Sequence, residues 1–204
     1  MPKKRIFVSA TNRGLKSFRL LASQSLRKRG YDVDDEAIFN LTWVEITERL
    51  EQRIGACDAV VCLIGVAYGG EPSEQPPDEP RRSYSQLEYL LALELGKPVY
   101  RLMAGEKTPF DADALEPESD EFRRVQNEFR AEVIRDKDWR AFASVDQLRA
   151  ELAELRFPRE GPAPEQSLAT CRWARLARSS RGAMSFLMTC TRGLVCPAGG
   201  RRPL

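Results

Sequence analysis

A single carboxylate in an apolar stretch is the residue of this chain with the clearest potential for chemistry. Glu88 falls in the first turn of an expected helix, and the residues at the following turns are Leu91, Ala92 and Leu95. Because residues three and four positions apart share one side of a helix, Glu88 lies on the side that packs inward. An acid at such a position either caps the helix or takes part in a reaction.

Two serines compete to begin this helix. If Ser85 is the N-cap, Glu88 stands three residues later and returns a hydrogen bond to the Ser85 backbone, as in a capping box. If Ser83 is the N-cap, Gln86 fills that place and Glu88 is available to face a cleft. The spacing alone does not decide between the two.

The composition narrows the chemistry that could accompany this acid. The chain has no His, and its five Cys include no Cys-x-x-Cys pair. A zinc site of the usual Cys/His type is therefore disfavoured, no metal site is expected, and a mechanism that needs an imidazole base is excluded. Cys57 and Cys62, which flank and lie within an apolar run, are expected to be small buried hydrophobic residues.

Composition and charge divide the chain into two parts. With 204 residues, 42% hydrophobic and 30% charged, it has the make-up of a soluble globular protein. We expect one domain over residues 1–157, followed by a linker and a basic, poorly ordered tail over 158–204. Residues 159–204 hold eight Arg against two Glu, whereas the whole chain carries a net charge of +2. The basic character thus belongs to the tail, and no nucleic acid partner is expected for the main domain.

Neither a leader peptide nor a membrane span is visible. Residues 1–5 run directly into an apolar strand, and no apolar run approaches the length of a membrane-spanning helix. The expected location is the cytoplasm, and no membrane partner is expected.

Strand-like and helix-like segments alternate along the main domain. The expected strands lie at residues 5–10, about 31–34, 59–65, 98–103 and 139–143. The expected helices lie at residues 16–29, 42–55, after 82, about 120–135 and 145–155. The continuous apolar run 59–65 is typical of a central parallel strand covered on both faces. We therefore predict an α/β fold of the flavodoxin-like kind, with a five-stranded parallel sheet in the order 2-1-3-4-5 and helices on both faces.

The predicted fold brings particular loops together. Ligands of open parallel sheets bind at the carboxyl ends of the strands, which here are followed by Ser9 to Gly14, by Asp34 to Trp43 and by Gly65 to Ser83. Glu88 begins the helix that the third of these loops enters, whereas Asp58 precedes its strand and falls on the opposite edge. No P-loop and no Gly-x-Gly-x-x-Gly pattern accompanies them, so a Rossmann dinucleotide fold is not supported.

Several short motifs follow one another in a defined order along this domain. They are the strand 5–11 with Leu15 and Arg19, and residues 58–61, 65 with 68–69, 83–89, 96–99, 122–123 and 142–148. In their order and spacing, which together are fairly specific, these motifs resemble the TIR-like domain of unknown function that often stands at the front of bacterial STAND-type NTPases. The resemblance covers residues 4–157.

This resemblance implies a role for Glu88 and for its surroundings. TIR domains and nucleoside deoxyribosyltransferases share the flavodoxin-like topology, and a glutamate that matches Glu88 acts on an N-glycosidic bond in their active members. Ser83 matches a serine that TIR domains commonly carry, and it is one of the residues expected to bind the ligand. Tyr68 or Trp43 would stack on a base, and the remaining cofactor-binding candidates would line the pocket. Those candidates are Ser9 and Arg13. NAD is expected as a substrate, and no bound cofactor is expected.

Three hypotheses follow. The leading one is a TIR-like effector or sensor domain, in bacterial defence or signalling, that binds NAD or a related nucleotide; whether it also hydrolyses the N-glycosidic bond through Glu88 is left open. Self-association or a STAND-type NTPase region would regulate it. The alternatives are a catalytically inactive TIR-like interaction module and, ranked lower, a nucleoside deoxyribosyltransferase-like enzyme, since the first loop lacks an obvious match to those enzymes.

Overall fold

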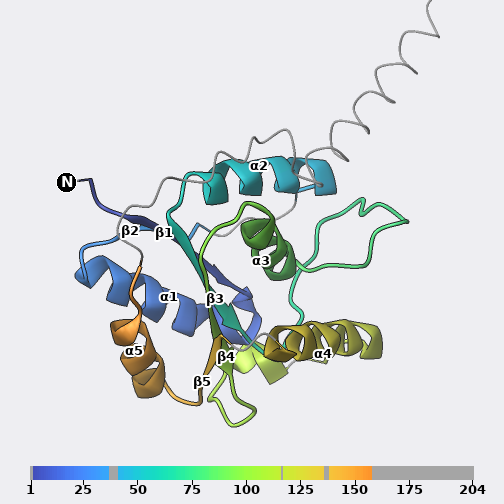
Figure 1. The fold of residues 1–204 in the computed structure, drawn as a ribbon. Coiled ribbons are helices and arrows are strands. Elements are labelled where there is room, and N and C mark those ends of the chain that lie inside the picture. Colours follow the sequence, from blue (N-terminus) through green and yellow to red (C-terminus); the bar gives the residue numbers. More distant parts are fainter. Residues whose placement is uncertain (1, 37–40, 116, 136–137, 158–204) are drawn as a thin grey trace, which may run out of the picture.

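Strands and helices alternate along the chain in the computed structural model, which describes residues 2–36, 41–115, 117–135 and 138–157 (Figure 1). The strands are β1 (Arg5–Ala10), β2 (Asp32–Asp34), β3 (Ala59–Ile64), β4 (Val99–Ala104) and β5 (Trp139–Phe142). The helices are α1 (Asn12–Lys28), α2 (Trp43–Gly55), α3 (Tyr84–Glu94), the 3-10 helix η1 (Ala112–Leu115), α4 (Asp120–Arg135) and α5 (Val145–Glu154). The expected tail over residues 158–204 lies outside the described residues.

The strands form one parallel sheet in the order β2-β1-β3-β4-β5. The predicted sheet and strand order are thus confirmed. β3 is central: Val61 pairs with Val8 of β1 and with Tyr100 of β4. All six β3 residues are buried, as its unbroken apolar sequence predicts.

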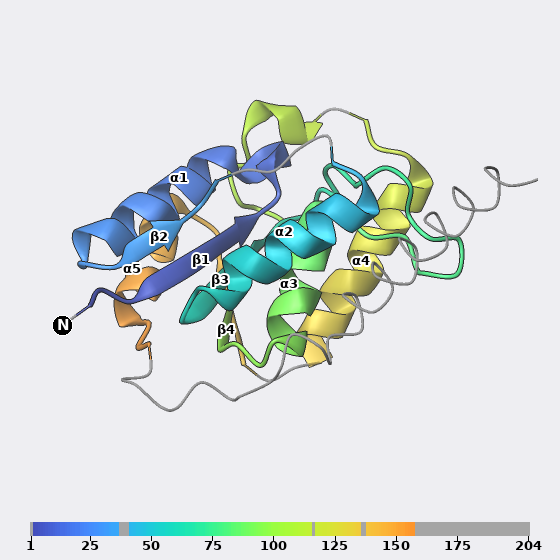
Figure 2. The same cartoon turned by 90° about the horizontal axis from the view of Figure 1, so that it is seen from above.

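Helices cover both faces of the sheet, which is also as predicted (Figure 2). Phe7 and Cys62 point to the face covered by α2, α3 and α4. The hydrophobic core on this face extends from these two residues to Phe129 of α4. Val8 and Leu63 point to the opposite face, where α1 and α5 pack. Because side chains alternate along a strand, Ser9 at the end of β1 shares the face of Phe7, beneath α3.

Helix starts follow from local capping. Thr42 caps α2 and forms a capping box with Glu45, at the residue where the expected helix 42–55 begins. α1 differs from expectation because it begins at Asn12 rather than near residue 16. Arg13 and Gly14 are non-helical and kink this first turn, so the regular part of the helix starts after Gly14, close to the predicted position.

One glycine holds two loops close together. Gly69 has a φ of +80°, and a Cβ added there would lie 2.2 Å from the Thr11 hydroxyl oxygen. We expect Gly69→Ala to lower the free energy of unfolding by about 2 kcal/mol, through backbone strain and overpacking together. Urea denaturation measures this change. Gly55→Ala is the matched control, since a Cβ there meets nothing within 4 Å; an equal loss in both variants would contradict the close approach.

No helix within the described ranges is long and apolar enough to cross a bilayer.

Candidate functional site

The candidate site lies where the sheet changes direction. The connection after β1 leads to β2 on one side, and the connection after β3 leads to β4 on the other, so the chain leaves the carboxyl ends of these two neighbouring strands in opposite directions. Ser9 of β1 stands beside Cys62 of β3 in the sheet register. α3 lies over these two strands and brings Glu88 to them.

Ser83, not Ser85, begins α3. The Ser83 hydroxyl accepts a hydrogen bond from the Gln86 amide at 3.4 Å, and the Gln86 side chain accepts one from the Ser83 amide at 3.2 Å. This is a complete capping box, and it leaves Glu88 outside the cap. The Ser83 hydroxyl, expected to bind ligand, has this capping bond and a 3.2 Å contact with the Ser85 hydroxyl.

The two serines should therefore differ in their effect on stability. We expect Ser83→Ala to lower the free energy of unfolding by about 1 kcal/mol, because it removes the N-cap of a central helix. Ser85→Ala should stay within about 0.5 kcal/mol of the wild type. Chemical denaturation of the two variants side by side measures the difference, and a larger loss from Ser85→Ala would contradict the capping assignment.

The Glu88 carboxylate does not cap α3 and is directed at the Ser9 side chain. The Ser9 hydroxyl donates a hydrogen bond of 2.5 Å to Glu88 Oε2, and Glu88 is only 6% exposed. Burial raises the pKa of Glu88, while the positive charge of Arg19, the Ser9 hydrogen bond and the charge of Arg53 oppose that rise. The site thus holds a carboxyl group whose neutral form is favoured more than that of an exposed glutamate.

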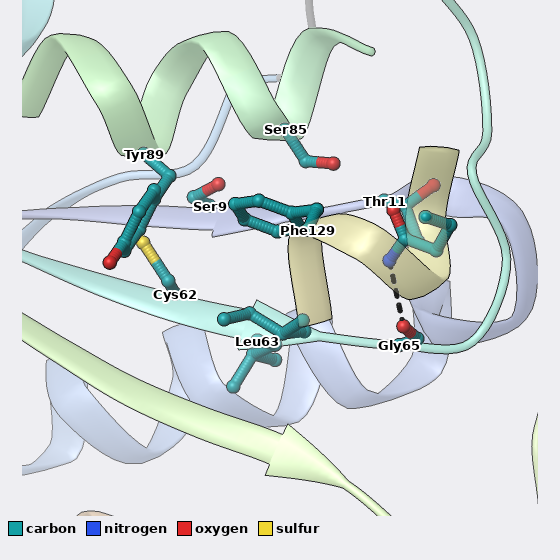
Figure 3. A pocket seen from close by; sticks show the side chains of 10 residues that line it. Ser9, Thr11, Cys62, Leu63, Gly65, Ser85, Tyr89 and Phe129 are labelled. Carbon is teal, nitrogen blue, oxygen red and sulfur yellow. Dashed lines mark hydrogen bonds between the residues drawn. The ribbon is translucent and has the colours of Figure 1, made fainter. Parts of the chain in front are cut away.

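A small cavity adjoins this pair (Figure 3). Ser9 and Cys62 line it from the sheet, Ser85 and Tyr89 from α3, and Phe129 from α4. Its volume of about 10 Å³ is close to the least that a single water needs. The surroundings of the Ser9–Glu88 pair are therefore closed in this conformation.

The two cysteines among the described residues are unreactive. Cys57 and Cys62 are buried free thiols, which confirms the prediction for both. Burial, with the nearby negative charge of Glu88, raises the pKa of Cys62 to about 12, and burial raises that of Cys57 to about 11. Both stay protonated at neutral pH, so neither is a nucleophile.

Two other candidates meet at a different carboxylate. Arg13 lies 3.6 Å from Glu118, whose oxygens also accept hydrogen bonds of 3.2 Å from the amides of Tyr68 and Gly69. The Tyr68 ring is fully buried and stacks on Phe122 at 4.8 Å between centroids. The structure thus joins Arg13 and Tyr68 to each other through Glu118, whereas Ser9 bonds Glu88.

Trp43 has a core position. It is 2% exposed and packs in the same cluster as Ile46 and Leu50 of its own helix. In this conformation its ring is covered by protein and presents no open face for a base.

Arg19 is not among the candidate site residues predicted from the sequence, although its position in the sequence carries a usable signal. Arg19 stands four residues after Leu15 and three before Ala22, so it lies on the apolar side of α1. Its exposure is 7%, and its charge acts on Glu88. A charged residue on the buried side of a helix was the same signal that singled out Glu88.

Within the described residues, no group of three or more His, Cys, Asp or Glu side chains is arranged to hold a metal ion.

Comparison with known proteins places this site inside one family domain. The family model described as a domain of unknown function, DUF4062, matches residues 5–155. That range holds all five strands together with Ser9, Arg19 and Glu88. A search of curated proteins found no match.

Proposed function

Since this chain belongs to the DUF4062 family, a domain of unknown function, we propose its function from the site itself: the domain binds NAD or a related nucleotide and hydrolyses the N-glycosidic bond through Glu88. One observation carries the proposal. Glu88 is a buried carboxyl group at the ligand-binding edge of a parallel sheet, its helix is capped by other residues, and Ser9 fixes its orientation.

The chemistry needs one carboxylate and no imidazole. As the bond between ribose and nicotinamide breaks, nicotinamide leaves with the bonding electrons and positive charge develops on the ribose. An ionised Glu88 beside the anomeric carbon stabilises that charge, in surroundings of low dielectric where the interaction is strong. Water then adds to the anomeric carbon, and its proton passes to the Glu88 carboxylate or to solvent. Burial raises the pKa of Glu88 and opposes its ionisation, whereas the charges of Arg19 and Arg53 partly offset this effect and favour the ionised form that the step requires.

The closed surroundings of Glu88 support the proposal that access of a nucleotide to this residue is regulated. A carboxylate that is 6% exposed, next to a cavity for a single water, must be uncovered before a nucleotide reaches it. We propose that association, with a second copy or with a STAND-type NTPase region, favours the open form, in the manner of a TIR-like sensor or effector domain. The same closure favours a second candidate function, an interaction module that carries out no chemistry.

The test compares these two functions directly. Concentrated protein, alone and in oligomerised form, is incubated with NAD, and nicotinamide release is followed by chromatography for the wild type and Glu88→Gln. Release by the wild type and not by the variant is the expected result. Equal release from both would contradict the role of Glu88, and no release in any assembly state would favour the interaction module.

A further inference from the structure

Arg19 has more hydrogen-bond donors than the described part of the chain uses. It is 7% exposed, and its Nη1 donates to the Asn12 side chain at 3.3 Å. Its Nε and Nη2 are buried, and neither has a hydrogen-bond partner among the described residues. A guanidinium is always protonated, so burying it with two donors unused is unfavourable unless another group supplies the acceptors.

The two unused donors have a defined geometry. Nε and Nη2 lie on the same edge of the planar guanidinium, and their N–H bonds run parallel. Carboxylates and phosphates match this edge with two oxygens at once, which is why arginine is common where such groups are bound. The missing acceptor is therefore best supplied by an oxyanion.

Arg19 also faces room for a ligand. It lines an open pocket of about 540 Å³, a size typical of small-molecule sites. Lys16 adds a second cation, and the remaining polar lining includes Asn12 and Asp35. The connection after β4 closes the other side, through residues 111–113.

The amides at the start of α1, which often bind phosphate in such folds, are already occupied. The Gly14 amide donates to Asp113 at 2.8 Å, and the Ser17 amide donates to Asp111 at 2.9 Å. Asp35 accepts a hydrogen bond of 2.7 Å from Arg27. An incoming anion is thus left to Arg19, with Lys16 beside it, rather than to the helix amides.

We infer that Arg19 is a binding residue for a phosphate group of the ligand in the pocket over α1, which Nε and Nη2 hold once a side-chain movement uncovers them. This inference rests on the proposed function and adds to it, because it names the part of the nucleotide that this pocket takes. The pocket and the carboxyl group act on each other, since the charge of Arg19 favours the ionised form of Glu88. A phosphate subsite and a glycosidic-bond site then lie on one edge of the sheet, as a nucleotide requires.

Titration calorimetry with AMP, inorganic phosphate and adenosine tests the inference. We expect Arg19→Gln to weaken AMP binding about tenfold or more, the loss typical of a charge-assisted hydrogen-bonded pair, and to leave adenosine binding unchanged. AMP binding with no detectable binding of inorganic phosphate would assign the site to a nucleotide, and similar Arg19-dependent binding of both would assign it to free phosphate. Lys28→Gln, which removes an exposed cation from the same helix, is the matched control and should bind AMP as the wild type does.

Several outcomes would overturn the inference. AMP affinity unchanged in Arg19→Gln, or lost equally in Lys28→Gln, would do so, as would the absence of AMP binding by the wild type at millimolar concentration. If circular dichroism shows that Arg19→Gln is unfolded, Arg19→Lys replaces it, because lysine keeps the charge and lacks the paired donors; wild-type affinity in that variant would contradict the assignment. Glu88→Gln should keep AMP binding, so this test can fail while nicotinamide release continues, and the reverse.

Discussion

Glu88→Gln is expected to abolish nicotinamide release, with a fall of roughly 10³-fold in rate, because the developing charge on the ribose loses its carboxylate. Glutamine keeps the size of the side chain and can still accept the hydrogen bond from Ser9. The loss would therefore come from charge rather than from shape. Glu132→Gln, an exposed position on α4, is the matched control and should retain the wild-type rate.

The same substitution should make the folded protein more stable at neutral pH. Burial raises the pKa of Glu88 above its ordinary value of 4.5, so the folded protein holds this proton more tightly than the unfolded chain does. The stability contributed by the neutral form is complete below pH 4.5 and is lost as the pH rises through the folded-state pKa. Glutamine cannot ionise, so Glu88→Gln avoids that loss. We expect a gain of about 1 kcal/mol at pH 7.5 that disappears near pH 4, the size common for stabilising single substitutions.

Urea denaturation of the wild type and of Glu88→Gln at the two pH values measures this difference. A variant that is less stable than the wild type at both would show that the carboxylate stabilises the fold. It would then belong with the structural residues rather than with a strained functional site.

The second large effect is expected at Arg53. Its side chain is 12% exposed and pairs with Asp34, whose side chain is 6% exposed, through Nη2 and through Nε at 3.3 Å. Its guanidinium also lies 5.4 Å from the centroid of the Phe7 ring. We expect Arg53→Met to lower the free energy of unfolding by about 3 kcal/mol, because it leaves a buried carboxylate without its main partner. Urea denaturation measures the change.

Arg5 provides the control for this pair. It also contacts Asp34, at 3.2 Å, but its side chain is 45% exposed. Solvent screens such a contact, so Arg5→Met should cost less than about 1 kcal/mol. Replacing Asp34 by leucine in the Arg53→Met background should recover much of the loss, because the uncompensated charge is then removed. Equal losses from the two single arginine variants would show that burial does not set the strength of this pair.

Much of the fold could be predicted because its signals are local. The strand Arg5–Ala10 and the helix Asp120–Arg135 have the bounds that their apolar spacing indicates. The parallel sheet follows from the alternation of strands and helices, and Thr42 with Glu45 shows where α2 begins. Each of these features depends on residues close together in the sequence.

The details of the site depend on contacts between distant segments. Ser83 and Ser85 fit the capping pattern equally well, and the choice is visible only in the folded chain. An aromatic residue after a buried strand fits a base-stacking role as well as a packing role, and Phe122, far along the chain, occupies the face of Tyr68. The position of the 3-10 helix η1 also depends on distant residues. The side chains of Asp111 and Asp113 accept hydrogen bonds from backbone amides of α1, and these bonds hold the connection after β4 against that helix.

Glu118 has a consequence for how the edge of the sheet can move. This one carboxylate, which follows β4, accepts hydrogen bonds from the loop after β3 at Tyr68 and Gly69, and it pairs with Arg13 after β1. Displacing any one of the three loops breaks a bond that helps to hold the other two. The loops around the carboxyl ends of the strands are therefore coupled and should open together, so that a partner that pulls on one of them is felt at all three.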